Sequence, residues 1–266
     1  MNANPSRFPI VLIAILLASA PPSAPETAQA PAGDAPPPPI RHIDPLDEGR
    51  AGAMHRGRNP HARLTPQQHI EVALKHFSAG RVPQALAALD QALIRYPSVA
   101  ELYNVRASIE LADGDSSGAL GDIEQAVRLA PEQPLYRVTR ARIYLKFERP
   151  AEAMADLDKA IELNPDLIPA RFNRGALLTY QGKYRQALAD FDRCIAVAPH
   201  LPAPYFNRGS VLWTLGEKKR AREDIQRFLR IARAESWKRA ARDLLKAWDA
   251  GGQTKPAAPI QGEETR

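Results

Sequence analysis

The fold of this chain is decided by one stretch, Ala170 to Pro199, which reads ARFNRGALLTYQGKYRQALADFDRCIAVAP. Its second half places Ala187, Phe191 and Cys194 four and three residues apart. This spacing puts a small, a large and a small side chain on one face of a helix. Its first half carries Gly175 inside another helical pattern, and small residues on both helices let the two helix axes approach closely. The stretch therefore predicts a tightly packed pair of helices.

The same pattern returns every 34 residues along the 266-residue chain. The closing proline recurs at Pro97, Pro131, Pro165 and Pro199. In the second helix, the first small site is Ala85, Ala119, Ala153, Ala187 and Ala221, the large site is Leu89, Ile123, Leu157, Phe191 and Ile225, and the second small site is Ala92, Ala126, Ala160, Cys194 and Phe228. The small site of the first helix is Ala73, Ala107, Ala141, Gly175 and Gly209. Such a period predicts stacked units that share one continuous core.

The period also sets the domain organisation. We predict five repeats over residues 66–99, 100–133, 134–167, 168–201 and 202–235. The array begins where Thr65, Pro66 and Gln68 form a helix start with an N-cap, a proline at the first helical position and a capping box. A last amphipathic helix over residues 236–248 is expected to cover the apolar end of the fifth repeat. Its large apolar residues are Trp237, Leu244, Leu245 and Trp248.

Together these rows resemble tetratricopeptide repeats, whose pattern is a small residue in the first helix, A-x3-F and A in the second, and a terminal proline. The resemblance covers residues 66–235 and implies an all-α fold, a right-handed superhelical α-α solenoid. The family has a large aromatic residue early in the first helix. At that position this chain has Tyr103, Tyr205, His69, Arg137 and Arg171. The resemblance implies that the first helices line a concave groove that receives a peptide or an extended segment of another protein.

The residues before the repeats have a different character. Residues 1–20 carry an apolar run from Ile10 to Ala18 and an Ala-x-Ala ending, which is the layout of a secretory signal. Because Pro21 follows directly and disfavours cleavage, an uncleaved membrane anchor is the alternative. Residues 21–63 form a proline-rich tether that we expect to be disordered, as is the tail over residues 249–266. We therefore predict export to the periplasm or envelope of a bacterium.

Two charged columns follow the same spacing. Arginines recur at Arg106, Arg140, Arg174 and Arg208, and 16 residues after each stand Asp122, Asp156, Asp190 and Asp224. The first repeat lacks both the arginine and the aspartate, and has Val72 and Ala88 at these positions. This is what structural ion pairs predict, because a half-buried charge without its partner costs about 3 to 5 kcal/mol. The alternative is a ladder of arginines for an anionic ligand, and we favour the ion pairs.

The inner face expected for the solenoid is rich in aromatic and amide side chains. It carries Arg142, Lys146, Phe172, Asn173, Tyr180, Phe206, Asn207 and Trp213. Amides can pair with a peptide backbone and aromatic rings supply contact area, so this face predicts a scaffold that binds a partner polypeptide. Packing between repeats is the alternative, above all for Phe172 and Phe206. The pattern by which some family members clamp a C-terminal carboxylate is not met, because the first row offers Ile70 and Leu74 there.

The C-terminal end of the array is basic. Residues 217–246 contain 11 Lys or Arg against 5 Asp or Glu, a net charge of +6 that equals the formal charge of the whole chain. The basic surface consists of Lys218, Lys219, Arg222, Arg230, Lys238 and Arg239. Docking on anionic lipid or cell-wall polymer is the alternative function, although a solvated helix face is the simpler interpretation. Export makes nucleic acid an unexpected partner.

The sequence shows no chemistry of its own. No stretch outside the repeats is long enough for a catalytic domain, and there is no glycine-rich phosphate loop and no serine elbow. Cys194 occupies a small core site, where a thiol is usually inert. Five of the six histidines lie between His42 and His76, but none makes an i, i+4 pair of metal ligands, and only His69 and His76 share a helical face. We expect no enzyme, no cofactor and no metal site.

Overall fold

The computed structural model describes residues 64–251, and this part of the chain contains eleven helices and no strand. The helices are α2 (Pro66–Ser78), α3 (Val82–Arg95), α4 (Ala100–Asp113), α5 (Ser116–Leu129), α6 (Pro134–Lys146), α7 (Pro150–Leu163), α8 (Ile168–Tyr180), α9 (Tyr184–Val197), α10 (Pro202–Thr214), α11 (Lys218–Ile231) and α12 (Glu235–Asp249). The first ten form five consecutive pairs, and each pair lies inside one of the five 34-residue ranges. The predicted all-α solenoid is confirmed. The expected signal and tether lie outside the described residues, as does the tail beyond residue 251.

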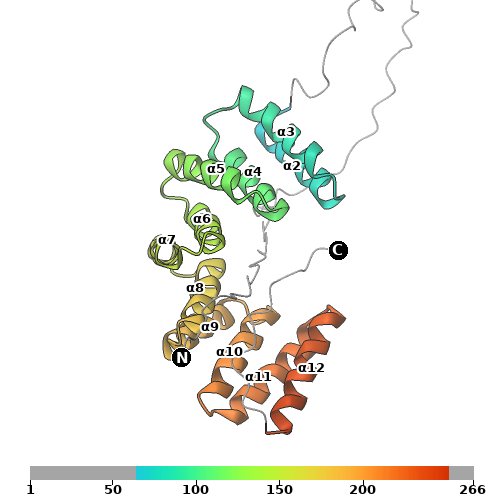
Figure 1. Ribbon diagram of the computed structural model, residues 1–266, viewed down its shortest axis with the longest axis vertical. Coiled ribbons are helices and arrows are strands. Elements are labelled where there is room, and N and C mark those ends of the chain that lie inside the picture. Colours follow the sequence, from blue (N-terminus) through green and yellow to red (C-terminus); the bar gives the residue numbers. More distant parts are fainter. Residues whose placement is uncertain (1–63, 252–266) are drawn as a thin grey trace, which may run out of the picture.

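The pairs follow one another along an arc that runs from α2 and α3 at one end to α12 at the other (Figure 1). The first helices of neighbouring pairs contact each other, as α4 does α6 and α8 does α10. The second helices of neighbouring pairs have no comparable contacts in the described part of the chain. The array therefore bends with its first helices, α2, α4, α6, α8 and α10, on the inside.

The small, large and small sites of the second helices form the core. Every residue of these three columns is fully buried, from Ala85, Leu89 and Ala92 in the first repeat to Ala221, Ile225 and Phe228 in the fifth. In the fourth repeat the residue at the large site is Phe191, and the residue of the first helix that faces it is Gly175. A Cβ atom at Gly175 would lie 2.9 Å from the Phe191 ring, closer than carbon atoms pack. The large ring of Phe191 is thus accommodated by the absence of a side chain at Gly175, and the two helices stay close together.

The turn between the two helices of a pair needs one residue in the left-handed conformation. Glycine takes this place in four repeats, with φ of 71° at Gly80, 101° at Gly114, 74° at Gly182 and 83° at Gly216. In the third repeat Glu148 has φ of 56° and is the non-glycine residue with positive φ in the described chain. A side chain in this conformation is sterically strained, because its Cβ crowds the following carbonyl oxygen. The third repeat therefore makes the same turn as the other four, with Glu148 in place of the glycine.

Replacing Glu148 with glycine should stabilise the protein by about 0.5–1 kcal/mol, because the strain is removed at a smaller cost in unfolded-chain entropy. Denaturant unfolding of the full chain measures the change. Glu148→Ala is the matched control, since it removes the carboxylate but keeps the Cβ, and it should change stability little. A glycine variant no more stable than the alanine variant would show that this turn carries no strain.

Both ends of the array are closed as the sequence predicted. At the start, the Thr65 hydroxyl accepts a hydrogen bond from the Gln68 backbone N–H (3.3 Å), and the Gln68 side chain accepts one from the Thr65 N–H (2.9 Å). At the other end, Trp248 of α12 is buried and stacks on Trp213 of α10, with ring centroids 4.2 Å apart and planes 3° from parallel. The last helix thus covers apolar surface of the fifth repeat.

Candidate functional site

The structure brings the two predicted charge columns together. Each arginine of a first helix donates from Nε and Nη2 to both carboxylate oxygens of the aspartate in the second helix of the same repeat, over distances of 2.5–2.8 Å. The pairs are Arg106–Asp122, Arg140–Asp156, Arg174–Asp190 and Arg208–Asp224. All four aspartates are buried. A two-fold bond of this kind fixes the relative position of two helices as well as joining them.

Three of these arginines also reach the preceding repeat. The Nη1 atoms of Arg106, Arg174 and Arg208 lie 2.6–2.8 Å from an oxygen of a second aspartate, in the second helix of the preceding repeat. In that helix the second aspartate comes two residues after the position equivalent to Asp122. These second partners are Asp90, Asp158 and Asp192, and they are exposed. Hydrogen bonding to the buried aspartate raises the pKa of each of the three guanidinium groups above its usual value. The guanidinium groups of the arginine column are therefore already bonded to carboxylates of the chain itself. This arrangement argues against the alternative that the column binds an anionic ligand.

The arginines at the family's aromatic position have a structural role that sequence reasoning missed. Tyr103 and Tyr205 donate from their hydroxyls to the carbonyl of the proline six residues earlier. Arg137 and Arg171 donate to the equivalent proline carbonyls, and each also reaches the buried aspartate of its repeat. Tyrosine and arginine thus make the same bond to the end of the preceding repeat. The recurring distance of six residues to a proline was the signal available in the sequence.

Removing either member of Arg208–Asp224 should destabilise the protein by about 3 to 5 kcal/mol, because it strands a buried charge, while removing both should cost clearly less than the sum. We choose this pair because Arg208 is the one cation bonded to Asp224 within residues 64–251, whereas Asp190 also receives Arg171. Unfolding of Arg208→Met, Asp224→Leu and the double variant completes the cycle. Additive losses would contradict the ion pair.

The inner face is built from side chains at equivalent positions of the first helices. Thr139 of α6, Asn173 of α8 and Asn207 of α10 are 34 residues apart and form one column of buried polar groups. The Thr139 hydroxyl donates to the Leu135 carbonyl, and the Asn173 amide nitrogen donates to the Pro169 carbonyl. Among the described residues, the Asn173 Oδ1 has no hydrogen-bond partner, and neither has Oδ1 or Nδ2 of Asn207. Asn173 is 3% exposed and Asn207 4% exposed.

Buried amide atoms without partners are rare because each forfeits hydrogen bonds to water, at a cost of about 1–3 kcal/mol. Two neighbouring first helices carry them at the same register. These atoms are therefore unsatisfied polar groups of the inner face.

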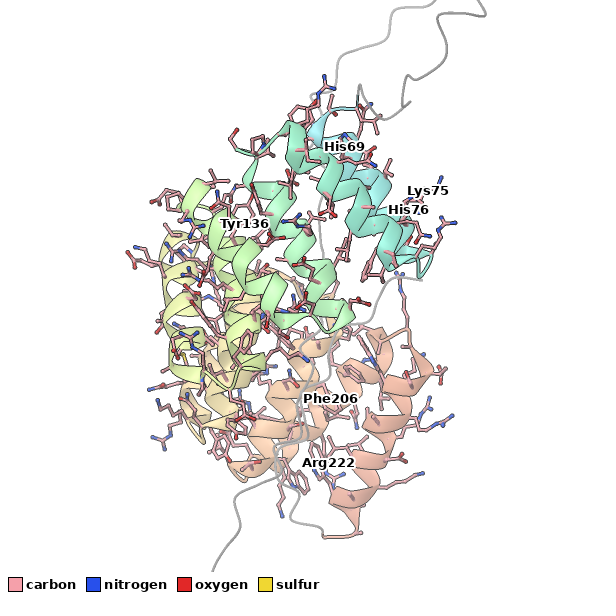
Figure 2. All side chains as sticks on the ribbon, turned by 45° about the horizontal axis from the view of Figure 1, so that its top comes forward. His69, Lys75, His76, Tyr136, Phe206 and Arg222 are labelled. Atoms are coloured by element: carbon pink, nitrogen blue, oxygen red, sulfur yellow. The ribbon has the colours of Figure 1, made fainter. Side chains whose placement is uncertain are left out.

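The aromatic rings expected on the inner face are mostly packed inside the protein. Phe172 is partly buried and lies edge-on to Phe191 of the core, with ring centroids 6.0 Å apart. Phe206 is buried against Phe228 at 5.2 Å, and Trp213 is buried against α12 as described above (Figure 2 shows Phe206). Phe206 and Trp213 are buried, so the expectation that these two rings are exposed was wrong, whereas Phe172 is partly buried. Phe172 and Phe206 pack within their own repeats rather than between repeats. Tyr180 differs, with 67% of its surface exposed.

Two cations lie beside the polar column. Arg142 and Lys146 are half-buried and stand one turn apart on α6. Burial lowers the pKa of Arg142 to about 9. Burial, together with the neighbouring Arg142 charge, lowers the pKa of Lys146. Both shifts reflect positive charge that is partly removed from water.

The predicted basic surface is divided by contacts within the C-terminal end. Lys218 and Arg222 lie over the Trp213 ring, 5.3 and 5.4 Å from its centroid, and Arg222 also pairs with Asp249 at 2.7 Å. Lys238 pairs with Glu235. Lys219, Arg230 and Arg239 are exposed. Docking of this surface on an anionic lipid or polymer stays a prediction.

The remaining candidates for chemistry are accounted for by packing. Cys194 is fully buried with its Sγ atom 3.7 Å from the Ile168 carbonyl, and burial raises the pKa of this thiol to about 12. His69 is buried beside Tyr96, and His76 lies on the same helix α2 at the N-terminal end of the array (Figure 2). Within residues 64–251 no three His, Cys, Asp or Glu side chains gather as metal ligands do. None of the helices in this range has the length and apolar character needed to cross a bilayer.

Family models of the tetratricopeptide repeat match residues 73–134, 110–168, 168–201 and 203–235. The chain belongs to the tetratricopeptide repeat family. Proteins of this family generally mediate protein–protein interactions and are typically not enzymes. No curated protein matches this chain.

Solved structures with the same fold include several bacterial repeat proteins. YrrB, described as a protein with an unusual peptide-binding site, is 24% identical with a TM-score of 0.51, over 68% of this chain and 92% of its own. A thermophilic repeat protein from Thermus thermophilus, TTC0263, is 19% identical with a TM-score of 0.60, over 68% of this chain and all of its own. PilW, described as a type IV pilus biogenesis factor, is 22% identical with a TM-score of 0.59, over 69% of this chain and 83% of its own. At these identities the likeness concerns the fold.

Proposed function

We propose that this tetratricopeptide repeat protein is a non-enzymatic scaffold that binds an extended segment of a partner polypeptide along its inner face. The observation that carries the proposal is the pair of buried amides, Asn173 and Asn207, whose unpaired atoms stand at the same position of neighbouring first helices. A side-chain amide offers a donor and an acceptor, the same two groups that a peptide backbone presents. An extended chain could therefore supply a donor for Asn173 Oδ1 and both a donor and an acceptor for the amide of Asn207.

The packing of the remainder of the molecule supports this assignment. The arginine column is bonded within and between repeats, and Phe206 and Trp213 are covered by the second helices and α12. What is left on the inner face is mainly polar, apart from Tyr180, Leu135 and the partly buried ring of Phe172. A ligand held mainly by backbone hydrogen bonds fits such a face better than an apolar helix does.

Replacing both amides should abolish capture of the partner. We expect the full chain, tagged and used as bait in extract of its native cells, to retain at least one protein that Asn173→Ala/Asn207→Ala does not retain. Each lost bond to a buried group weakens binding by about 1–3 kcal/mol. Gln186→Ala is the matched control, because Gln186 is an exposed amide on the second helix α9. Equal recovery by the bait and by the double amide variant would contradict binding at this face.

We further propose that the protein acts outside the cytoplasm. The support is the basic start, the apolar run and the Ala-x-Ala ending within residues 1–20. Cell fractionation with N-terminal sequencing tests it: recovery in the periplasm or envelope, cleaved or still anchored, is expected, and recovery in the cytoplasm would contradict it.

A further inference from the structure

The boundary between the second and third repeats lacks an ion pair that the other boundaries have. The arginine column links the first repeat to the second, the third to the fourth and the fourth to the fifth. Arg140 of the third repeat is bonded to Asp156 of its own repeat. In the second repeat the position of the bridging aspartates is occupied by Glu124, which makes no ion pair within residues 64–251. The side-chain bond left across this boundary is that of Arg137 to the Pro131 carbonyl, at 3.3 Å.

The second helix at this boundary, α5, has the weakest helix-forming sequence of its kind. Among α3, α5, α7, α9 and α11, it is the one that contains glycine, at Gly118 and Gly121. A glycine inside a helix makes the helix about 2- to 5-fold less favourable than alanine does. A Cβ atom at Gly121 would meet nothing of its surroundings within 4 Å, so packing does not require this glycine. The equivalent residues of α3, α7 and α9 are exposed alanines, Ala87, Ala155 and Ala189.

Two carboxyl groups crowd the first turn of α5. A Cβ atom at Gly118 would lie 2.6 Å from Oδ2 of Asp115, the N-cap of α5, and 3.2 Å from Cδ of Glu110, which belongs to the last turn of α4. Asp115 accepts hydrogen bonds from the backbone N–H groups of Ser117 and Gly118. The Glu110 Oε2 atom is buried and has no hydrogen-bond partner in the described chain. A buried carboxylate oxygen without a donor weakens the packing of α4 against α5.

The charges around Glu110 are mostly negative. Burial raises its pKa to about 7, Asp122 of α5, Asp115 of the turn and Asp90 of α3 add to the rise, and Arg106 of α4 opposes it. An acid whose pKa is raised by folding stabilises the folded state at low pH, and this stability is lost as the pH rises from the ordinary pKa toward the raised one. Packing of α5 should therefore weaken between about pH 4.5 and 7.

We infer that α5 is a weak joint of the array, at which the second repeat opens as a local unit while the repeats on both sides stay folded. Three independent features meet in this one helix: the missing ion pair, the glycine that packing does not require, and the unpaired carboxylate over its first turn. The first helices α4 and α6 contact each other on the inside of the arc, so the chain stays connected there when α5 opens. The opening does not depend on what the inner face binds.

Native-state hydrogen exchange of the full chain tests the inference. Each interior repeat has two neighbours and each terminal repeat one, so an interior helix should ordinarily be at least as protected as a terminal one. We expect the opposite for α5. Amides around Ile123 should be at least about 10-fold less protected than those around Leu89 of α3, Leu157 of α7 and Phe191 of α9. Equal protection of α5 and α7 would overturn the inference.

A pair of reciprocal variants separates the helix from its surroundings. Gly121→Ala should raise the protection of α5 about 2- to 5-fold, because alanine fits the open space and favours the helix. Ala155→Gly, at the equivalent position, should lower the protection of α7 by a similar factor. That α7 should still be better protected than α5 of the unchanged protein, since Asp158 keeps its bond to Arg174. Unchanged protection of α5 in Gly121→Ala would show that the helix does not open, against the inference.

The same measurement at two pH values tests the part of Glu110. After correction for intrinsic exchange, α5 should be at least about 5-fold less protected at pH 7.5 than at pH 5. Glu110→Gln should remove most of this difference. Glu152→Gln, which changes an exposed carboxylate of α7 paired with Arg149, should leave it in place. A difference that persists in Glu110→Gln would contradict the part assigned to Glu110.

Discussion

The bond between a first-helix arginine and a buried second-helix aspartate is the interaction on which this solenoid depends. A buried aspartate is tolerated because both of its oxygens receive hydrogen bonds from a group with fixed fork geometry. The same guanidinium extends a third donor to the preceding repeat at Arg106, Arg174 and Arg208. One side chain thus joins two helices and two repeats. A stack of small helical pairs, none of which can bury its own apolar face alone, gains its order from such shared partners.

Because the four arginines of the column are bonded within the fold, binding of a partner would have to rely on other residues. The second helices bury their small, large and small columns, and α12 covers Trp213. On the inside of the arc the first helices then offer the buried polar groups of Thr139, Asn173 and Asn207.

Much of the fold was predictable because it follows from a strict period. The columns at Ala187 and Phe191 fix which helix faces meet, and the paired loss of arginine and aspartate in the first row identified the ion pairs. The inner face was less predictable, because a large ring at a given register can turn toward its own repeat or toward solvent. Phe206 and Trp213 turn inward, since Phe228 and Trp248 offer them partners that the repeat pattern does not specify. Thr139 was missed for the opposite reason, because a small hydroxyl carries little signal in a single sequence.

Native-state amide hydrogen exchange of the full chain carrying Arg174→Met tests the central claim most directly. Arg174 is bonded to Asp190 in its own repeat and to Asp158 in the repeat before. If the arginines couple neighbouring repeats, protection should fall in α7 as well as in α8 and α9, while α2 and α3 keep theirs. Loss of protection confined to α8 and α9 would contradict the coupling between repeats, and unchanged protection in all three helices would contradict the role of the arginine altogether.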